Sequence, residues 1–266
     1  MSDRKRGIAV VTGGSSGIGR ATALRFAGAG WVVYELSRKG QSGEGIRHIT
    51  ADVTEEASLA AAFRQIADEH GRIDVLVNNA GFGISGAVEY TKLEDAQRQM
   101  DVNFFGTVRS IQQALPYLRR SERAHIVNIS SMGGPLALPF QAFYSCSKSA
   151  INTLTMALAN ELRPFGIAVC AVMPGDVATG FTDAREKSDA GAEVYKGAVE
   201  RSVGTMERDE RGGMSPDRIA AKVYRMARKK HPKPLSTVGV QYKLFAVLNK
   251  LLPASLVNRI IGKMYS

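Results

Sequence analysis

Short apolar segments alternate with helical segments along this chain, and no other feature restricts the possible folds as strongly. The segments predicted as strands cover residues 8–12, 31–36, 48–51, 74–77, 125–129 and 168–172. Strands that alternate with helices are typical of parallel βαβ units. The 266 residues show no internal repeat or linker, so we expect one α/β domain over 1–266. Its predicted architecture is a doubly wound parallel sheet with helices on both faces.

A glycine-rich loop, Thr12-Gly13-Gly14-Ser15-Ser16-Gly17-Ile18-Gly19, joins the first predicted strand to a helix predicted over 20–29. This arrangement presents backbone N–H groups and a helix N-terminus to a diphosphate, and glycine lets phosphates approach because it has no Cβ. A glycine-rich turn without a ligand is the alternative for the loop alone. Its position between a strand and a helix favours a dinucleotide site in a Rossmann-like fold.

The tip of the second strand carries Ser37 and Arg38. A site for NAD usually has a carboxylate there, whereas an arginine suits the ribose phosphate of NADP. The sequence therefore favours NADP(H), and a solvated surface arginine is the alternative. Residues 39–45 are short and rich in glycine, which predicts a loop in place of a crossover helix.

Polar residues also follow the third and fourth strands. Asp52 either accepts a hydrogen bond from an adenine amino group or assists a helix over 55–70, for which Thr54 is the predicted cap. Asn78 and Asn79 are expected to bond neighbouring backbone groups or a ribose. Ala80 and Gly81, which follow them, leave room for a cofactor.

The stretch from Ser131 to Lys148 begins where the fifth strand ends, at the sheet edge where open α/β sheets bind ligands. Tyr144 and Lys148 are four residues apart, so a helix continuing to about residue 163 places them on one face. An ammonium beside a phenol favours the phenolate, and we expect Lys148 to lower the pKa of Tyr144 toward the range of a general acid/base. An ordinary amphipathic helix face is the alternative for the pair alone.

A long helical pattern covers residues 93–118 and has Asn103 in its middle. Asparagine is mildly unfavourable inside a helix. A bent backbone or an ordered water is one explanation, and a solvent-facing polar residue is the other.

The last third of the chain departs from the alternating pattern. Residues 180–213 are polar with scattered glycines, as expected of a mobile lid over the substrate, and Ser215 and Pro216 begin a further helix. The tail 242–266 is apolar and basic with helical periodicity, broken at Pro253. It packs on its own core, closes a subunit interface or makes peripheral contact with a membrane surface.

The composition of the chain argues against several classes of function and binding site. The net charge of +10 comes from dispersed basic residues without an aromatic-studded basic motif, so we do not expect nucleic-acid binding. The two cysteines, Cys146 and Cys170, lack the spacing of metal ligands, so no metal site is predicted and a cytoplasmic location is expected. We also expect no signal peptide before residue 8 and no membrane-spanning segment.

Taken together, the motifs resemble those of the short-chain dehydrogenase/reductase family over nearly the whole chain. The matching elements, in the family's order, are Thr12-Gly13-x-x-x-Gly17-x-Gly19, Asp52-Val53, Asn78-Asn79-Ala80-Gly81, Asn103, Ser131, Tyr144-x-x-x-Lys148 and Pro174-Gly175. The resemblance is to the compact, NADP-preferring branch, and residues 138–140 are similar to hydroxysteroid dehydrogenases. The 39–45 loop departs from the family pattern, as does Cys146 where alanine is common.

The resemblance implies roles for particular residues. Tyr144 would be the general acid/base, Ser131 would bond the substrate oxygen, Lys148 would hold the nicotinamide ribose, and Asn103 would support a water relay. Ser130 is expected to be structural. The residues expected to contact the cofactor are Gly13, Ser15, Ser16, Gly17, Ile18, Gly19, Ser37, Arg38, Asp52, Val53, Asn79, Ala80, Gly81, Tyr144, Lys148, Pro174, Gly175, Val177 and Thr179.

We therefore predict an NADP(H)-dependent oxidoreductase that transfers hydride between the nicotinamide and a carbonyl or secondary alcohol. Met132, Phe140, Phe181 and the apolar tail suggest a lipophilic small molecule such as a steroid, retinoid or long-chain carbonyl. A homodimer or homotetramer is expected by analogy with the family. The alternative function is that of a catalytically idle NADP(H)-binding sensor or scaffold protein.

Overall fold

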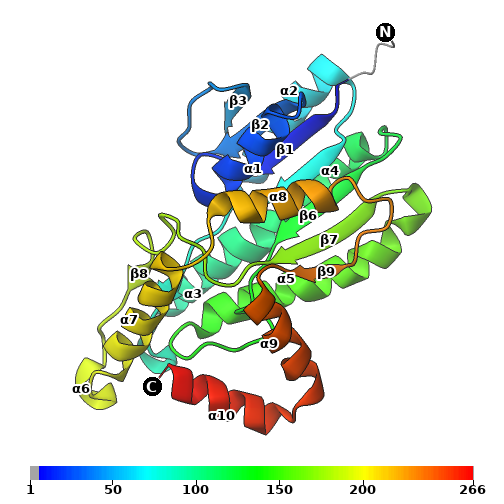
Figure 1. Ribbon diagram of the computed structural model, residues 1–266. Helices are drawn as coiled ribbons and strands as arrows, with labels where there is room; N and C mark the ends of the chain where they lie inside the picture. The colour runs from blue at the N-terminus through cyan, green and yellow to red at the C-terminus, as the bar shows by residue number, and fades with distance from the viewer. Residues whose placement is uncertain (1–5, 266) are drawn as a thin grey trace.

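A parallel β-sheet with helices on both faces runs through the computed structural model, which describes residues 6–265 (Figure 1). The charged N-terminal segment lies outside the described residues apart from Arg6, as does Ser266 at the end of the predicted tail. The strands of the sheet, in spatial order, are β3 (Ile46–Thr50), β2 (Val32–Ser37), β1 (Ile8–Thr12), β4 (Val75–Asn78), β6 (His125–Ile129), β7 (Ala168–Met173) and β9 (Leu235–Thr237). Every neighbouring pair in this order is parallel.

The helices differ in whether they cover the sheet or extend beyond it. They are α1 (Gly17–Ala27), α2 (Glu56–His70), α3 (Leu93–Met100), α4 (Gly106–Leu118), α5 (Ala142–Glu161), α6 (Ala192–Tyr195), α7 (Ala198–Arg211), α8 (Pro216–Met226), α9 (Val240–Leu251) and α10 (Ala254–Met264). Shorter elements are β5 (Ile84–Ser85), η1 (Val88–Tyr90), η2 (Asp101–Phe105), η3 (Arg163–Phe165) and β8 (Glu186–Lys187), with β5 and β8 forming a two-stranded sheet. In Figure 1, α7, α9 and α10 lie beyond the carboxyl ends of the strands.

Alternate residues of each strand enter two separate cores. Ile8 and Val10 of β1 pack with α2 and α4 on one face, whereas Ala9 and Val11 pack with α1 and α8 on the other. All four side chains are buried because both faces of a parallel sheet are covered by helices. Because both faces of the sheet are buried, the strands appear in the sequence as continuous apolar runs.

The strand order reverses between β1 and β4. From β1 the chain proceeds outward through β2 and β3, then returns to β4 on the other side of β1. Adjacent loops diverge at such a switch point and leave a crevice at the carboxyl ends of the strands. The glycine loop after β1 and the Asn79–Gly81 segment after β4 both border this crevice, since a Cβ on Gly13 would lie 2.9 Å from the Cα of Ala80.

The strand and helix boundaries agree closely with the predictions for most elements, and residues 39–45 contain no helix. The predicted cap of α2 is wrong. The N-cap residue is Glu55 and no side chain caps the helix, because Thr54 instead donates its backbone N–H and hydroxyl to the carboxylate of Asp52. Ser215 does cap α8 by accepting from the N–H of Arg218.

Asn103 lies in a short π-helical segment, η2, which joins α3 to α4. The predicted bend is therefore confirmed, and the alternative of a solvent-facing residue is wrong because Asn103 is fully buried. Its side-chain oxygen accepts from the N–H of Phe82 at 3.0 Å, and its amide group donates to the carbonyl of Phe82 at 3.0 Å. The irregular turn is stabilised by these bonds to the segment after β4.

Several elements were not predicted, among them β9 and α7 as well as the short β5, β8 and α6. The strand β9 is only three residues long and includes two polar residues, so it gave no apolar run. The helix α7 lies within the predicted lid, and its buried residues Val199, Val203 and Met206 stand at helical spacing. The predicted tail consists of α9 and α10, separated at Pro253.

No helix within residues 6–265 combines the length and the apolar character that crossing a bilayer requires.

The contact between Gly175 and Tyr242 gives a stability prediction. A Cβ on Gly175 would lie 2.2 Å from the ring of Tyr242, so Gly175→Ala must displace α9. We expect the variant to lose about 1–3 kcal/mol of unfolding free energy in urea and to be cleaved faster by protease within the tail. Gly180→Ala is the matched control, because nothing lies within 4 Å of a Cβ there. Equal stability of the two variants would contradict the packing.

Candidate active site

A cavity of about 980 Å³ lies at the carboxyl ends of β4, β6 and β7. The residues that follow these strands line it, together with α5 and α9, α10 and the end of α7. Ser131, Tyr144 and Lys148 all border this cavity. The structure therefore brings together three of the four residues predicted to be catalytic, and Asn103 lies behind them.

Tyr144 and Lys148 lie on the first two turns of α5, and Ser131 lies two residues beyond the end of β6. The hydroxyls of Ser131 and Tyr144 are within hydrogen-bonding contact, and the N–H of Gly133 donates to Ser131 Oγ at 3.0 Å. Ser130 is buried and donates its hydroxyl to the carbonyl of Lys148 at 3.1 Å. Ser130 thus holds α5 against β6, as expected of a structural residue.

The ammonium of Lys148 is directed to the backbone and the ring face of Tyr144. Its Nζ donates to the carbonyl of Ile129 at 2.9 Å and lies 5.7 Å from the centre of the Tyr144 ring. Burial lowers the pKa of Lys148 to about 8, because no carboxylate compensates the desolvated ammonium.

The pKa of Tyr144 is raised to about 12, chiefly by burial, while its hydrogen bond with Ser131 acts to lower it. The other principal influences on this pKa come from Glu210, Arg185 and Asp176, and Lys148 is not one of them. The expectation that Lys148 lowers the pKa of Tyr144 is therefore wrong for the protein alone, since Nζ lies over the ring and bonds a carbonyl. At neutral pH the Tyr144 phenol is protonated and suited to donate a proton.

Asn103 is connected to the site by hydrogen bonds through neighbouring residues. Its amide donates to Ser147 Oγ at 3.2 Å, which in turn donates to the carbonyl of Tyr144 at 2.7 Å. A Cβ on Gly81 would lie 3.0 Å from Asn103 Oδ1 and 3.8 Å from Lys148 Nζ. Glycine at position 81 therefore keeps open a narrow space between the asparagine amide and the ammonium.

The glycine loop is shaped to receive a diphosphate. The helix α1 begins at Gly17 with no side-chain cap and no acidic residue in its first turn, so its N-terminus is available to an anion. Gly13 and Gly17 have positive φ angles of 63° and 53°, which favour glycine. Asn79 fixes the loop by donating its amide to the carbonyls of Thr12 at 3.2 Å and Gly13 at 2.9 Å. These residues fit a dinucleotide cofactor.

The other predicted cofactor residues divide into three groups. Those that line the main cavity are Ile18, Asn79, Gly81, Pro174, Gly175, Val177 and Thr179. Those that do not line it are Gly13, Ser16, Gly17, Gly19, Ser37, Arg38, Asp52, Val53 and Ala80. Ser15 lines a second, open hollow of about 620 Å³ beside the glycine loop.

This second hollow carries cationic side chains that the sequence analysis missed. Arg20 and Lys39 line it together with Ser42, whereas Arg38 does not. Arg20 also forms an ion pair with Glu44, which holds the 39–45 loop beside α1. The position of Arg20 directly after the glycine motif was a usable signal, but the contact of the loop with α1 was not foreseeable from spacing.

The predicted substrate residues are not all on the cavity wall. Met132 and Phe181 line it, and the Phe181 ring lies 5.8 Å from that of Tyr144. Phe140 does not line the cavity, so its prediction as a wall residue is wrong. Its backbone has a φ of 58°, and its ring packs against Tyr195 in a cluster with Ala87, Val199 and Val203.

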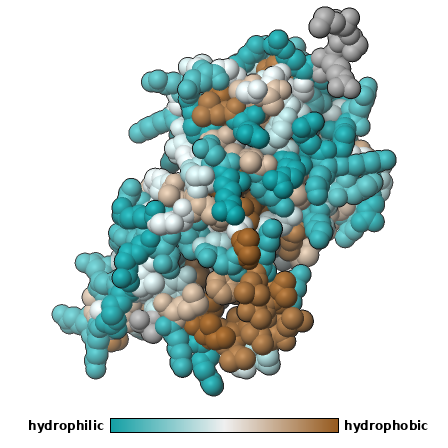
Figure 2. Space-filling model, in the orientation of Figure 1, coloured by the Kyte–Doolittle hydropathy of each residue, from teal (hydrophilic) through white to brown (hydrophobic). Residues whose placement is uncertain are grey.

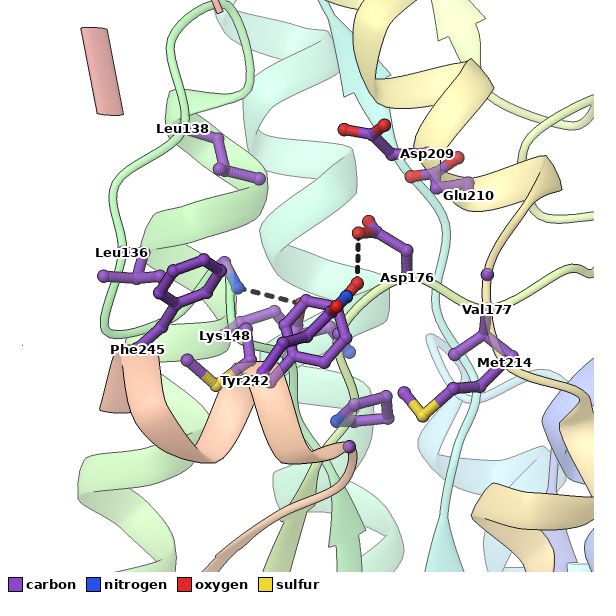
Figure 3. Close-up of a pocket in the computed structure, with 18 of the residues that line it drawn as sticks. Leu136, Leu138, Lys148, Asp176, Val177, Asp209, Glu210, Met214, Tyr242 and Phe245 are labelled. Atoms are coloured by element: carbon purple, nitrogen blue, oxygen red, sulfur yellow. Dashed lines mark hydrogen bonds between the residues drawn. The ribbon is translucent and has the colours of Figure 1, made fainter. Parts of the chain in front are cut away.

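Three carboxylates on the cavity wall were also missed. Asp176, Asp209 and Glu210 approach one another in Figure 3, opposite the apolar side chains of Leu136 and Phe245. Tyr242 donates its hydroxyl to Asp176 at 2.5 Å. Burial raises the pKa of Asp176, and the nearby carboxylates of Asp209 and Glu210 raise it further, against the effect of the Tyr242 bond.

Within residues 6–265 no group of three or more histidine, cysteine, aspartate or glutamate side chains is arranged to hold a metal ion.

The buried ammonium predicts a pH dependence of stability. The pKa of Lys148 is about 8 in the folded protein and 10.5 for an ordinary lysine, so the unfolded chain binds the proton more tightly. The unfolding free energy of the wild type should therefore rise relative to Lys148→Met as the pH increases from about 8 to 10.5, by about 3 kcal/mol in all. Urea denaturation at several pH values measures this difference. Lys92→Met, at an exposed lysine, is the control, and parallel profiles for wild type and Lys148→Met would contradict the assignment.

Comparison with known proteins agrees with this geometry. Residues 7–190 match the family model described as short chain dehydrogenase. A relative named 3-ketodihydrosphingosine reductase, from Bacteroides thetaiotaomicron, is 41% identical over 97% of this chain and 98% of its own length. The probable short-chain type dehydrogenase/reductase VdlC of Helicobacter pylori is 31% identical over 93% of this chain and 94% of its own length.

Solved structures show the same fold. The aldohexose dehydrogenase of Thermoplasma acidophilum superposes with a TM-score of 0.76 at 31% identity, covering 89% of this chain and 94% of that one. A structure described as ElxO with NADP bound superposes with a TM-score of 0.73 at 26% identity, covering 90% and 99%. A matching family model over residues 7–190, relatives aligned along almost the full length and the Ser131, Tyr144 and Lys148 site lead to one conclusion: the chain belongs to the short-chain dehydrogenase family of oxidoreductases.

Proposed function

We propose that this protein uses NADPH to reduce a long-chain ketone with an amino group beside the carbonyl, the chemistry named in its Bacteroides relative. The observation that carries the proposal is a single cavity with three different regions. Ser131, Tyr144 and Lys148 line one part of it, the carboxylates of Asp176, Asp209 and Glu210 line another, and apolar residues of α9 and α10 line a third.

The residues of the chain have distinct tasks in this reaction. Ser131 hydrogen-bonds the ketone oxygen and orients it toward Tyr144, whose protonated phenol donates its proton to that oxygen. Lys148 holds the nicotinamide ribose, and Asn103 supports the water relay that returns a proton to Tyr144. A bound NADPH would supply hydride to the carbonyl carbon, and with the proton from Tyr144 the product would be a secondary alcohol.

Reduction is the favoured direction in this proposal. The pKa of Tyr144 near 12 keeps the phenol protonated at neutral pH, as an acid that protonates a developing alkoxide requires. Oxidation of an alcohol would instead need the phenolate as a base.

The choice of NADPH rests on the second hollow. Arg20 and Lys39 line it beside the glycine loop, and Arg38 follows the adjacent strand. Cationic side chains there would attract the additional phosphate of NADPH. The N-terminus of α1 and the loop glycines would hold the diphosphate.

We further propose that the protein acts in the cytoplasm as a homodimer or homotetramer. Both cysteines are free, which suits a reducing compartment. Phe105, the last residue of η2 before α4, and Met156 on α5 are exposed apolar residues, and these are the helices expected to pair by analogy with the family.

Substitution of the proposed acid tests the mechanism. Tyr144→Phe should lower the rate of 3-ketodihydrosphingosine reduction about a thousandfold, because the proton donor is lost. Fluorescence titration should still detect NADPH binding, with NADH bound about tenfold more weakly. Tyr90→Phe, at an exposed tyrosine that does not line the cavity, is the control. Substantial turnover by Tyr144→Phe would refute the mechanism, and a wild type without turnover would favour the idle sensor.

Substitution of a cavity carboxylate tests whether the protein recognises the amino group of the substrate. Asp209→Asn should raise the KM for 3-ketodihydrosphingosine about tenfold, because one charge that attracts the substrate ammonium is removed. The KM for a ketone of the same chain length without the amino group should not change. Asp68→Asn, at an exposed aspartate of α2, controls for the loss of charge. Equal KM changes for both ketones would contradict recognition of the amine.

A further inference from the structure

The helix α9 has an apolar face directed away from the rest of the protein. Val240 is 78% exposed and Leu251 is 74% exposed, and Leu244, Val247 and Leu248 between them are also exposed. These residues stand four, seven, eight and eleven positions after Val240, which places them on one side of the helix. The opposite side is directed inward, where Tyr242 is buried.

The helix α10 extends this apolar face. Leu256, Ile260 and Met264 are exposed and stand four residues apart, along one side of the helix. Figure 2 shows hydrophobic side chains gathered at the end of the molecule where Figure 1 places α9 and α10. We name this set the tail surface, and it consists of Val240, Leu244, Val247, Leu248, Leu251, Leu256, Ile260 and Met264.

The charged side chains of the two helices that carry the tail surface are all basic. The charged residues of α9 and α10 are Lys243, Lys250, Arg259 and Lys263. Residues 218–266 contain eleven lysines and arginines and no aspartate or glutamate, whereas residues 1–217 contain 24 basic and 25 acidic residues. The excess positive charge of the whole protein therefore lies in the segment that includes the tail surface.

The tail surface is continuous with the cavity. Leu248, Ile260 and Met264 belong to the exposed face and also line the cavity wall. Inward-facing residues of the same two helices, including Phe245 and Ile261, form more of that wall. An alkyl chain that entered between these residues would remain in apolar contact from the outer surface to the interior.

We propose that the tail surface lies on an anionic lipid bilayer, with the cavity open toward the acyl chains. A helix with an apolar face and basic flanks is suited to the membrane interface, where buried apolar area and attraction to anionic headgroups both contribute. A second copy of this chain fits less well, because two tail surfaces in contact would bring their basic residues together. The entry of a lipid substrate into the cavity from the bilayer rests on the proposed function, whereas docking itself does not.

Co-sedimentation of the full chain with vesicles tests the docking. Vesicles of phosphatidylglycerol and phosphatidylcholine should retain the wild type, and vesicles of phosphatidylcholine alone should retain it less. Added salt should weaken binding to the anionic vesicles because it screens the basic residues. The paired substitution Leu244→Glu and Leu251→Glu should lower the partition coefficient at least tenfold, since neither residue lines the cavity and both are exposed.

The control pair is Leu93→Glu and Val194→Glu, which makes the same change at exposed positions on α3 and α6 and should leave vesicle binding unchanged. Reduction of a short, water-soluble ketone should be equal in the wild type and both pairs, which shows that each variant is folded. Equal vesicle binding by the two pairs would overturn the proposal. So would a change from dimer to monomer in sedimentation velocity, for the tail variant only, without loss of vesicle binding.

These experiments distinguish an error in the docking proposal from an error in the proposed function. Vesicle binding without reduction of 3-ketodihydrosphingosine would support docking and contradict the proposed substrate. Reduction of that ketone from detergent micelles without vesicle binding would support the substrate and overturn docking.

Discussion

The bond between the ammonium of Lys148 and the carbonyl of Ile129 connects the sheet to the site. It ties the first turns of α5 to the end of β6, and Ser130 strengthens the connection by donating to the carbonyl of Lys148. A buried ammonium without a carboxylate costs free energy, which is why its pKa falls to about 8. The fold carries this cost at the point where the proposed chemistry requires a cation, and perturbed pKa values are common at active sites. Ser131 and Tyr144 depend on the same junction for their mutual position.

Two regions of different character meet at the cavity. At the sheet edge, the strands are buried on both faces and the loops are held by bonds such as those from Asn79 to the glycine loop. The opposite wall is formed by helices that extend beyond the sheet, and Tyr242 joins them to the edge by packing on Gly175 and donating to Asp176. The proposed catalytic groups thus lie at the edge of the sheet, whereas much of the proposed substrate-binding wall lies on the helices beyond it.

Several residues show how far sequence reasoning extended into the site. The glycine loop, Asn79, Ser131, Tyr144 and Lys148 were found because their spacing follows strand ends and helix turns, which are local properties. Arg20, Lys39 and Asp209 were missed because each reaches its hollow through contacts between distant segments. Phe140 was misplaced because a single positive φ angle turned its ring toward α7. The direction of the Tyr144 pKa was wrong because burial exceeds the influence of an ammonium that faces a carbonyl.

Alternating apolar runs and fixed motif spacings are properties of a few turns of chain, so they were enough to predict the parallel α/β fold, the family and the proposed catalytic segment. The helical periodicity of the tail and its break at Pro253 were predicted in the same way and correspond to α9 and α10. Which side of each tail helix is directed inward and which stays exposed follows from tertiary packing. That choice depends on the packing of Tyr242 and Ile261 against the sheet edge, a contact between segments far apart in the chain that periodicity cannot specify.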